Sequence, residues 1–575
     1  RFLLALAYEG LKRYDDALAS LGPVLASASG PLKNDAEFTQ ASVLLAMKRF
    51  AEAIGPLEAF LGNRPSAETA VQGRCNLAIC LARTKQFDKA KKLLADLLEK
   101  HPGHALIEPT MEQLAEAAYE GGDTAWSKEL FGRLAKRGSA PDKQLTGLAG
   151  LGWSQFKAGQ LEEAAATFAQ VLAKKPEAGV AAETALARGQ VLEKLKQADG
   201  ALAMYDLVIS SHPTSKEMPQ AMLAAARLRH GMHQDEPAAA LFERLSKEYP
   251  KLPEMDAVLY DWAWTLTDQN KEPQSSEVFE RLRREFPQSP YWPDATLRLA
   301  QRALAAKQYG RARELAGAAL ARTPEPPLKE SAMFLLGQIA AAEEKWQESR
   351  DAFEALAKEF PSGALHLSAE YGLAEAMFRL GQFEAARGRF EQLAREARGR
   401  DKAILPLALL RQAQALVQQK KWEEAYRIAS TMEEEFPGFA EQYEVDYLLG
   451  RCLANRAEFD QAREAYRRVI RSQGGAKTLA AANAQLLTAE TYYHQKNYQS
   501  ALREYLKVEL LYAFPAVQAA ALVQAGKCYE LLHEWKQAAE VYQRVTKNYK
   551  DTAFATEAAT LLQSARQRAE KEDRR

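Results

Sequence analysis

The residues with the clearest metal-binding spacing in this chain are two histidines followed by two acidic residues. His230 and His233 lie three positions apart, and Asp235 and Glu236 come shortly after them. Imidazole and carboxylate groups can hold Zn²⁺ when four ligands converge on one point. Here the two histidines fall at the end of one helical segment and in the turn that follows it. We therefore interpret them as exposed structural histidines and expect no metal.

Two glycine- and lysine-containing segments invite comparison with phosphate-binding loops. Residues 474–478 read Gly-Gly-Ala-Lys-Thr but lack the adjacent Gly-Lys pair that such a loop requires. The Gly526-Lys527 pair has Ala521 where the first loop glycine should be, and it lies inside a helical segment. The scattered Ser, His and Asp residues show no nucleophile motif. The sequence therefore predicts a non-catalytic protein without a cofactor.

The four cysteines do not form a pattern typical of disulfides. Cys80, Cys452 and Cys528 occupy equivalent positions of the repeat described below, and Cys75 precedes Cys80 on one helical segment. Equivalent positions two repeats apart are too distant for a disulfide, which requires Cα atoms within about 7 Å. We interpret all four as buried packing residues. Unpaired cysteines mildly favour a reducing compartment and are still compatible with the periplasm.

These residues are positioned by a repeat that runs through nearly the whole chain. The segment Lys329–Pro361 contains two apolar runs at helical spacing, separated by the polar turn Glu343-Glu344-Lys345. With Ser349 as the reference position, small residues recur about every 37 positions. The fifteen reference residues are Ala17, Ala53, Ala90, Ser127, Ala164, Ala201, Ala238, Ser275, Ala312, Ser349, Ala386, Ala425, Ala462, Ala501 and Ala538. One such hairpin cannot bury its apolar faces alone, so the repeats must stack.

Several positions, numbered here from the reference residue of each repeat, hold one kind of side chain. Position −12 is Ala or Gly in all fifteen copies, which predicts a close approach of two helix backbones. Position +4 is large and apolar in thirteen copies, and position +7 is apolar in every copy. Position −3 is aromatic in ten copies, and position +12 is Pro in nine, which ends the second helix.

This order of small, aromatic, Ala, aromatic and Pro positions resembles the tetratricopeptide repeat (TPR), whose usual period is 34 residues. The resemblance covers nearly the whole chain and implies an all-α solenoid, a right-handed superhelix of antiparallel helix pairs. The longer period, Leu or Val at position +7, and the repeat endings depart from the common pattern. Those endings are His212-Pro213-Thr214-Ser215, Phe286-Pro287-Gln288-Ser289 and Phe360-Pro361-Ser362. They resemble a bacterial cell-envelope subtype, that of outer-membrane assembly lipoproteins and the Tol-Pal coordinator.

The balance of charge limits the kinds of partner. The chain has 76 basic and 76 acidic residues, so no global field would attract nucleic acid. No apolar run approaches the roughly 18 residues of a membrane-spanning helix. We expect other proteins or peptide segments as partners, with no nucleic acid and no membrane insertion.

By resemblance, the first helix of each hairpin lines the concave surface, and position −11 should point there. This position is mixed in the first five copies, Leu6, Ser42, Ile79, Glu116 and Trp153, and almost wholly polar from Gln190 onward. The candidate partner-binding residues are Arg227, Trp264, Gln301, Gln338, Glu375, Gln414, Arg451, Glu490 and Lys527. Polar residues with one Trp on a concave wall suit peptide recognition. The alternative is an ordinary solvated helix face.

We expect one continuous array over residues 1–552, with a truncated first repeat, and a capping helix with a charged tail over residues 553–575. Because the chain opens within a helix, we also expect further sequence upstream. The favoured function is a scaffold of the bacterial cell envelope, periplasmic or outer-membrane associated, that binds partner proteins or peptides on its concave face. The alternatives are a cytoplasmic TPR adaptor or assembly factor, and the TPR part of a larger protein with an upstream catalytic or sensor domain.

Overall fold

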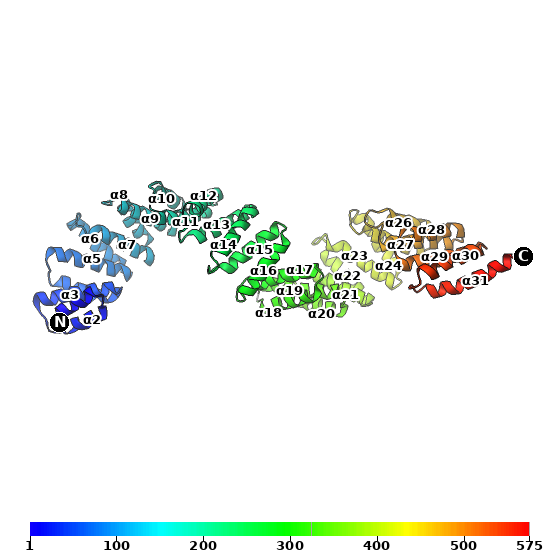
Figure 1. Cartoon of the computed structure of the whole chain (residues 1–575), viewed down its shortest axis with the longest axis horizontal. Coiled ribbons are helices and arrows are strands. Elements are labelled where there is room, and N and C mark those ends of the chain that lie inside the picture. The colour runs from blue at the N-terminus through cyan, green and yellow to red at the C-terminus, as the bar shows by residue number, and fades with distance from the viewer. Residues whose placement is uncertain (324, 574–575) are drawn as a thin grey trace. The chain divides into compact units, whose positions relative to one another are not determined.

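The chain folds into paired α-helices that correspond to the predicted hairpins (Figure 1). The computed structural model describes residues 1–323 and 325–573, and these contain 31 helices and no β-strand. The all-α prediction is confirmed. The chain divides into two compact units, Arg1–Phe286 and Pro287–Arg575, and each unit is described by itself.

The first unit contains eight hairpins. Its helices are α1 (Phe2–Gly10), α2 (Tyr14–Ser27), α3 (Gly30–Ala46), α4 (Phe50–Gly62), α5 (Ala67–Arg83), α6 (Phe87–Lys100), α7 (Ile107–Gly121), α8 (Thr124–Arg137), α9 (Pro141–Lys157), α10 (Leu161–Ala173), α11 (Ala178–Lys194), α12 (Ala198–Ser211), α13 (Met218–Gly231), α14 (Asp235–Glu248), α15 (Met255–Asp268) and α16 (Glu272–Glu285).

The second unit contains seven hairpins and a final single helix that packs on α30. Its helices are α17 (Trp292–Ala305), α18 (Tyr309–Arg322), α19 (Pro326–Ala342), α20 (Trp346–Glu359), α21 (His366–Arg379), α22 (Phe383–Ala397), α23 (Ile404–Gln418), α24 (Trp422–Glu435), α25 (Gln442–Asn455), α26 (Phe459–Arg471), α27 (Leu479–His494), α28 (Tyr498–Leu511), α29 (Pro515–Leu531), α30 (Trp535–Asn548) and α31 (Ala555–Asp573).

The turn inside each hairpin has one recurring backbone conformation. The residue at position −5 has a positive φ in all fifteen repeats, and in twelve of them it is not glycine. The twelve, with φ between 57° and 63°, are Lys12, Lys48, Lys85, Lys196, His233, Asn270, Lys307, Glu344, Lys420, Ala457, Lys496 and His533. Left-handed backbone costs an L-residue roughly 1–2 kcal/mol, so the two helices that the turn joins must stabilise it. The second helix begins two residues later, at position −3, in every hairpin.

The predicted apolar positions form the core. Residues at the reference position and at −12, +4 and +7 are buried in every repeat. Where the reference residue is Ser275 or Ser349, its hydroxyl donates a hydrogen bond to a backbone carbonyl, that of Ala263 (2.7 Å) or Gly337 (3.0 Å). Both acceptors are the position −12 residue of the same hairpin. In these two repeats the buried hydroxyl therefore links the second helix to the first without remaining unsatisfied, whereas the hydroxyl of the third reference serine, Ser127, pairs with that of Ser154 in the next hairpin (2.8 Å).

The small residue at position −12 faces an aromatic ring. The copies with glycine there are Gly152, Gly189, Gly337, Gly450 and Gly526, and all five have Phe or Tyr at position +4. A Cβ atom added to any of these glycines would lie closer than 3.0 Å to that ring, a distance that real Cβ atoms essentially never show. The prediction of two backbones in contact is therefore wrong at these positions, because the ring of the second helix takes the space.

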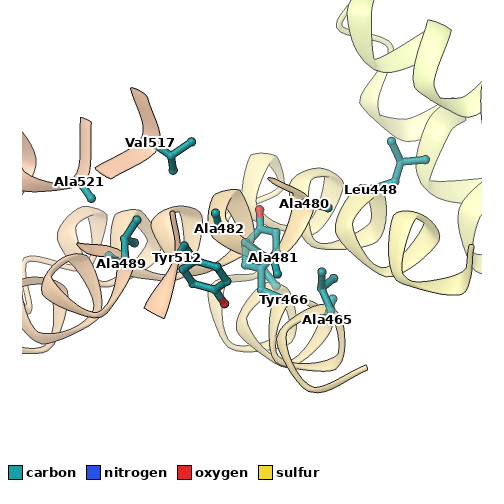
Figure 2. Packing of buried hydrophobic residues seen from close by; sticks show 14 of the residues in the cluster. Leu448, Ala465, Tyr466, Ala480, Ala481, Ala482, Ala489, Tyr512, Val517 and Ala521 are labelled. Carbon is teal, nitrogen blue, oxygen red and sulfur yellow. The ribbon is translucent and has the colours of Figure 1, made fainter. Parts of the chain in front are cut away.

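The ring at position +4 also reaches the next hairpin. Phe353 would collide with a Cβ atom on Gly337 of its own repeat and equally with one on Gly372 in the first helix of the following repeat. Figure 2 shows the core around another such ring, Tyr466, which lies in a cluster with small side chains such as Ala481 and Ala482. One aromatic side chain therefore fixes both the closure of a hairpin and its distance from its neighbour.

One junction of the first unit departs from the regular stack. Helix α7 packs mainly against α5 and α8 and barely touches α6, although successive helices elsewhere in the unit pack closely. In α5, the buried Cys75 stands at position −15, where many repeats have Phe or Tyr. With α7 against α5, space remains between α6 and α8.

Replacement of Gly450 by Leu tests the ring contact. We expect the variant to lose roughly 1–3 kcal/mol of stability or more, because the new side chain must displace Tyr466 from a filled core. The matched control is Gly388→Leu, at an exposed helical glycine with no atom within 4 Å of an added Cβ. Thermal melts of the two variants should differ clearly, and equal melting temperatures would contradict this placement of the ring.

Replacement of Ala457 by Gly tests the strain in the hairpin turn. Glycine adopts a φ of 60° without a steric penalty, so we expect a gain of about 0.5–1 kcal/mol. The same change at Ala355, an exposed residue within α20, should destabilise the protein by a similar amount, because glycine is a poor helix former. Calorimetry would compare the two variants, and a fall in melting temperature for both would show that the turn is unstrained.

Candidate partner-binding surface

The nine candidate residues lie one to a repeat on the first helices of their hairpins. Arg227 and Trp264 belong to α13 and α15 of the first unit, and the other seven belong to the odd-numbered helices from α17 to α29 of the second. Each is exposed or half-buried. We call the side chains at position −11 and their neighbours on the odd-numbered helices the first-helix surface. Binding of a partner there remains a prediction.

In the second unit, three of these helices are joined by a polar chain on the first-helix surface. Glu375 of α21 accepts a hydrogen bond from Arg379 Nε (2.8 Å) and forms an ion pair with Arg411 Nε of α23 (2.9 Å). Arg411 Nη1 also donates to Gln414 Oε1 (2.6 Å), and the amide of Gln414 lies 3.5 Å from a carboxylate oxygen of Glu444 in α25. These candidates therefore also hold neighbouring hairpins together.

Three other candidates contact side chains of this chain through ion pairs or aromatic rings. Arg227 Nε pairs with Asp261 Oδ2 (2.6 Å), and Lys527 Nζ pairs with Glu557 Oε1 (2.8 Å). The guanidinium of Arg451 lies over two rings, 5.6 Å from the centre of Trp422 and 5.9 Å from that of Tyr447. Such exposed pairs contribute little to stability, so a partner can displace them at low cost.

Three further candidates, Trp264, Gln301 and Gln338, have uncharged side chains and so cannot join neighbouring hairpins by an ion pair. Trp264 makes edge-to-face contacts with Tyr260 and Phe279, with ring centres 6.3 and 6.2 Å apart. Gln301 accepts a hydrogen bond from Arg298 Nη1 (3.2 Å). Gln338 projects from α19 as an exposed side chain. Trp264 is therefore anchored in the core by its ring, whereas the two glutamines face solvent.

The structure adds a feature that the choice of candidates missed, on the first-helix surface of the first unit. Two adjoining cavities of about 320 and 350 Å³ share Trp153 and Glu183 as lining residues. The first lies along α7, α9 and α11, and the second continues to α13. We call the two cavities together the Trp153 groove. Trp153 was visible in the sequence as an aromatic residue at position −11, but the mixed character of the first five copies hid its importance.

A third cavity lies at the irregular junction between α6 and α8. Its volume is about 1230 Å³, and its lining includes Leu98, Met111 and Leu134 together with the basic Lys136 and Arg137. It follows from the displacement of α7 toward α5. This cavity is larger than the Trp153 groove, but it lies away from position −11.

The histidine pair and the cysteines are accounted for by local contacts. His230 Nδ1 lies 2.7 Å from Asp235 Oδ1, while His233 holds the left-handed position of its turn. Among the described residues, no group of three or more His, Cys, Asp or Glu side chains could hold a metal ion. All four cysteines are buried and unpaired, as predicted. Burial raises the pKa of Cys80 and of Cys528 to about 12, so these thiols are inert at neutral pH.

Within the part of the chain that the structure describes, no helix combines the length and apolar character needed to cross a membrane.

Three solved structures are similar to this chain in the arrangement of their helices. They are the APC/C hetero-tetramer Cut9–Hcn1 (15% identity, TM-score 0.35, 95% of this chain and 98% of that chain), Naa15/Naa10 bound to HypK-THB (13%, 0.32, 98% and 95%) and yeast Tom70 (13%, 0.30, 86% and 95%). These identities and TM-scores carry no argument about function. A search of curated proteins gave no match.

Comparison with protein families gives a direct result. A sequence model described as a tetratricopeptide repeat matches residues 2–68, 112–177, 149–216, 297–364 and 447–516. A second with the same description matches residues 76–104 and 520–552, and a tetratricopeptide repeat-like domain matches residues 331–479. Since the first of these alone covers more than half of the chain, the protein belongs to the tetratricopeptide repeat family.

Proposed function

We propose that this chain is a non-catalytic scaffold that holds other proteins, or peptide segments of them, against the first-helix surface. The observation that carries the proposal is the combination of side chains and cavities on that surface. It combines half-buried polar side chains from successive repeats with cavities around an aromatic residue, whereas the second helices supply the core rings. Repeats of this family build extended surfaces rather than enclosed active sites, which suits binding.

We further propose that the scaffold works in the bacterial cell envelope, in the periplasm or at the outer membrane. The support is the form of the repeat endings, such as His212-Pro213-Thr214-Ser215. Unpaired cysteines do not weigh against this location, because burial protects all four thiols from oxidation. A cytoplasmic adaptor, or the repeat part of a larger protein, is the alternative that the same surface would serve.

A basic group of a partner would offset the desolvation cost of the half-buried Glu490 carboxylate. This half-buried carboxylate of α27 has no hydrogen bond or ion pair among the described residues, while several other candidates are paired with the chain itself. Burial raises the pKa of Glu490, opposed in part by His494. An unmatched carboxylate on a proposed binding surface is a favourable place for a basic group of the partner.

Site-specific photo-crosslinking in the native cells tests the scaffold and its location together. A photoreactive residue at Gln338, exposed on α19, should capture partner proteins, and one at Glu354, exposed on the second helix α20, should capture far fewer. Mass spectrometry would identify the products. Envelope proteins would support the proposed location, and soluble cytoplasmic proteins would favour the adaptor. Equal capture at both positions would contradict the use of the first-helix surface.

The pH dependence of stability tests the state of Glu490. A raised carboxyl pKa means that the folded chain binds this proton more tightly than the unfolded chain does. Stability contributed at this site is therefore lost as pH rises from the ordinary glutamate pKa, about 4.3, through the raised value. We expect Glu490→Gln to melt at a higher temperature than wild type at pH 7, with the difference vanishing near pH 4. Glu354→Gln is the control, and a difference independent of pH would contradict the assignment.

A further inference from the structure

We propose that the Trp153 groove binds an extended segment of a partner protein through a basic side chain, arginine or lysine, placed beside Trp153. This inference rests on the proposed function, since it names the chemistry of the segment that one part of the first-helix surface accepts. The groove has small residues along it, an aromatic ring that is held in place, and an excess of acidic side chains.

Small residues line the groove on two successive first helices. Gly150 of α9 lines the first cavity, and Ala187 of α11 lines the second, both at position −14. A side chain at Gly150 would meet Phe131, whose ring also lines the first cavity. Volumes of about 320 and 350 Å³ fall at the small end of the 300–1,000 Å³ range of ligand pockets. They suit single side chains of an extended segment better than a whole helix.

Trp153 presents a ring that is already held in place. It packs edge-on against Phe168, with ring centres 5.6 Å apart, and in a tilted arrangement against Phe156, with ring centres 6.1 Å apart. Because the half-buried ring also lines both cavities, a ligand need not order it on binding. An indole face attracts a guanidinium or ammonium group more strongly than other aromatic faces do. At the near end of the groove, Lys157 Nζ already lies 4.4 Å from the centre of the Tyr119 ring, so this surface holds cations on rings.

The charged side chains of the groove are predominantly acidic. Its lining includes four glutamates, Glu116, Glu120, Glu183 and Glu217, and one basic residue, Lys216. Arg83 pairs with Glu116 (Nη2 to Oε2, 3.2 Å) and with Glu120, so these two carboxylates are partly matched. The other two glutamates, Glu183 in both cavities and Glu217 in the second, are not paired with an arginine.

Two carboxylates of the groove lack a matching cation inside it. Glu183, which lines both cavities, is an exposed side chain with no hydrogen bond or ion pair among the described residues. Glu217 is only 6% exposed, and its one ion pair is a long contact of 3.6 Å with Lys216, whose side chain is 84% exposed. A guanidinium or ammonium in the cavity would form charge-assisted hydrogen bonds with both carboxylates, and it would offset the desolvation cost of the buried Glu217. An acidic segment or a nucleic acid would increase it.

Selection from a random peptide library tests the proposal. A library of displayed twelve-residue peptides would be selected on the full chain, and selected peptides would be measured by fluorescence polarisation. We expect enriched peptides to contain Arg or Lys, and to lose at least tenfold in affinity when that residue is replaced by Gln. Affinity should also fall with added salt, because the attraction is electrostatic.

Variants of the chain show whether those peptides use the groove. Trp153→Ala and the double variant Glu183→Gln/Glu217→Gln should each weaken binding at least tenfold, and Trp153→Phe should weaken it less. The matched control is Glu99→Gln/Glu162→Gln, two exposed glutamates on second helices of the same unit. Circular dichroism melts would establish that all variants are folded.

Selected peptides without basic residues, or basic peptides equally sensitive to the groove and control variants, would overturn the proposal, as would a selection that yields no groove-dependent basic peptide. In each of these cases, partner capture at Gln338 would leave the scaffold function standing. Failure of that crosslink alone would instead count against the wider first-helix surface.

Discussion

The packing of one aromatic ring per repeat governs the arrangement of most hairpins. At position +4 the ring lies over a position −12 residue that has at most one carbon of side chain, and it extends to the first helix of the next repeat. Phe353 between Gly337 and Gly372 shows both contacts in one residue. Since each hairpin of a solenoid touches only its neighbours, this contact must close the hairpin and also space the stack. The first helices, and any surface that they carry, stand where the rings put them.

The two units use their first-helix surfaces differently. In the second unit, Glu375, Arg411 and Gln414 connect three successive first helices, so polar side chains brace the stack. In the first unit, small residues such as Gly150 leave cavities beside Trp153, and the acidic groups there are incompletely matched. A braced polar surface favours stability, and unmatched charge, in the Trp153 groove as at Glu490 of the second unit, favours binding. The same column of the repeat thus serves two physical purposes along one chain.

Much of the fold could be predicted from the sequence, because its causes are local and repeated. Apolar residues at helical spacing predicted the helix pairs, and the residue types at positions −12, +4 and +7 predicted the core. The left-handed turn at position −5 could not be predicted, because residues as different as Lys420, Ala457 and Glu344 occupy it. The Trp153 groove could not be predicted either. Its shape depends on small residues of separate repeats, Gly150 and Ala187, and no single position of the repeat shows that they lie along one groove.

Because each ring fits one particular facing residue, the hairpins of this chain are not interchangeable. This limits which hairpins a gene can lose or duplicate. Loss of the whole eleventh hairpin would bring Arg411, which stands at position −14 of its repeat, to the place that Gly372 holds against Phe353. A long charged side chain would then meet a buried ring. Duplication or deletion of single hairpins is therefore restricted to joints whose ring and facing residue agree in size.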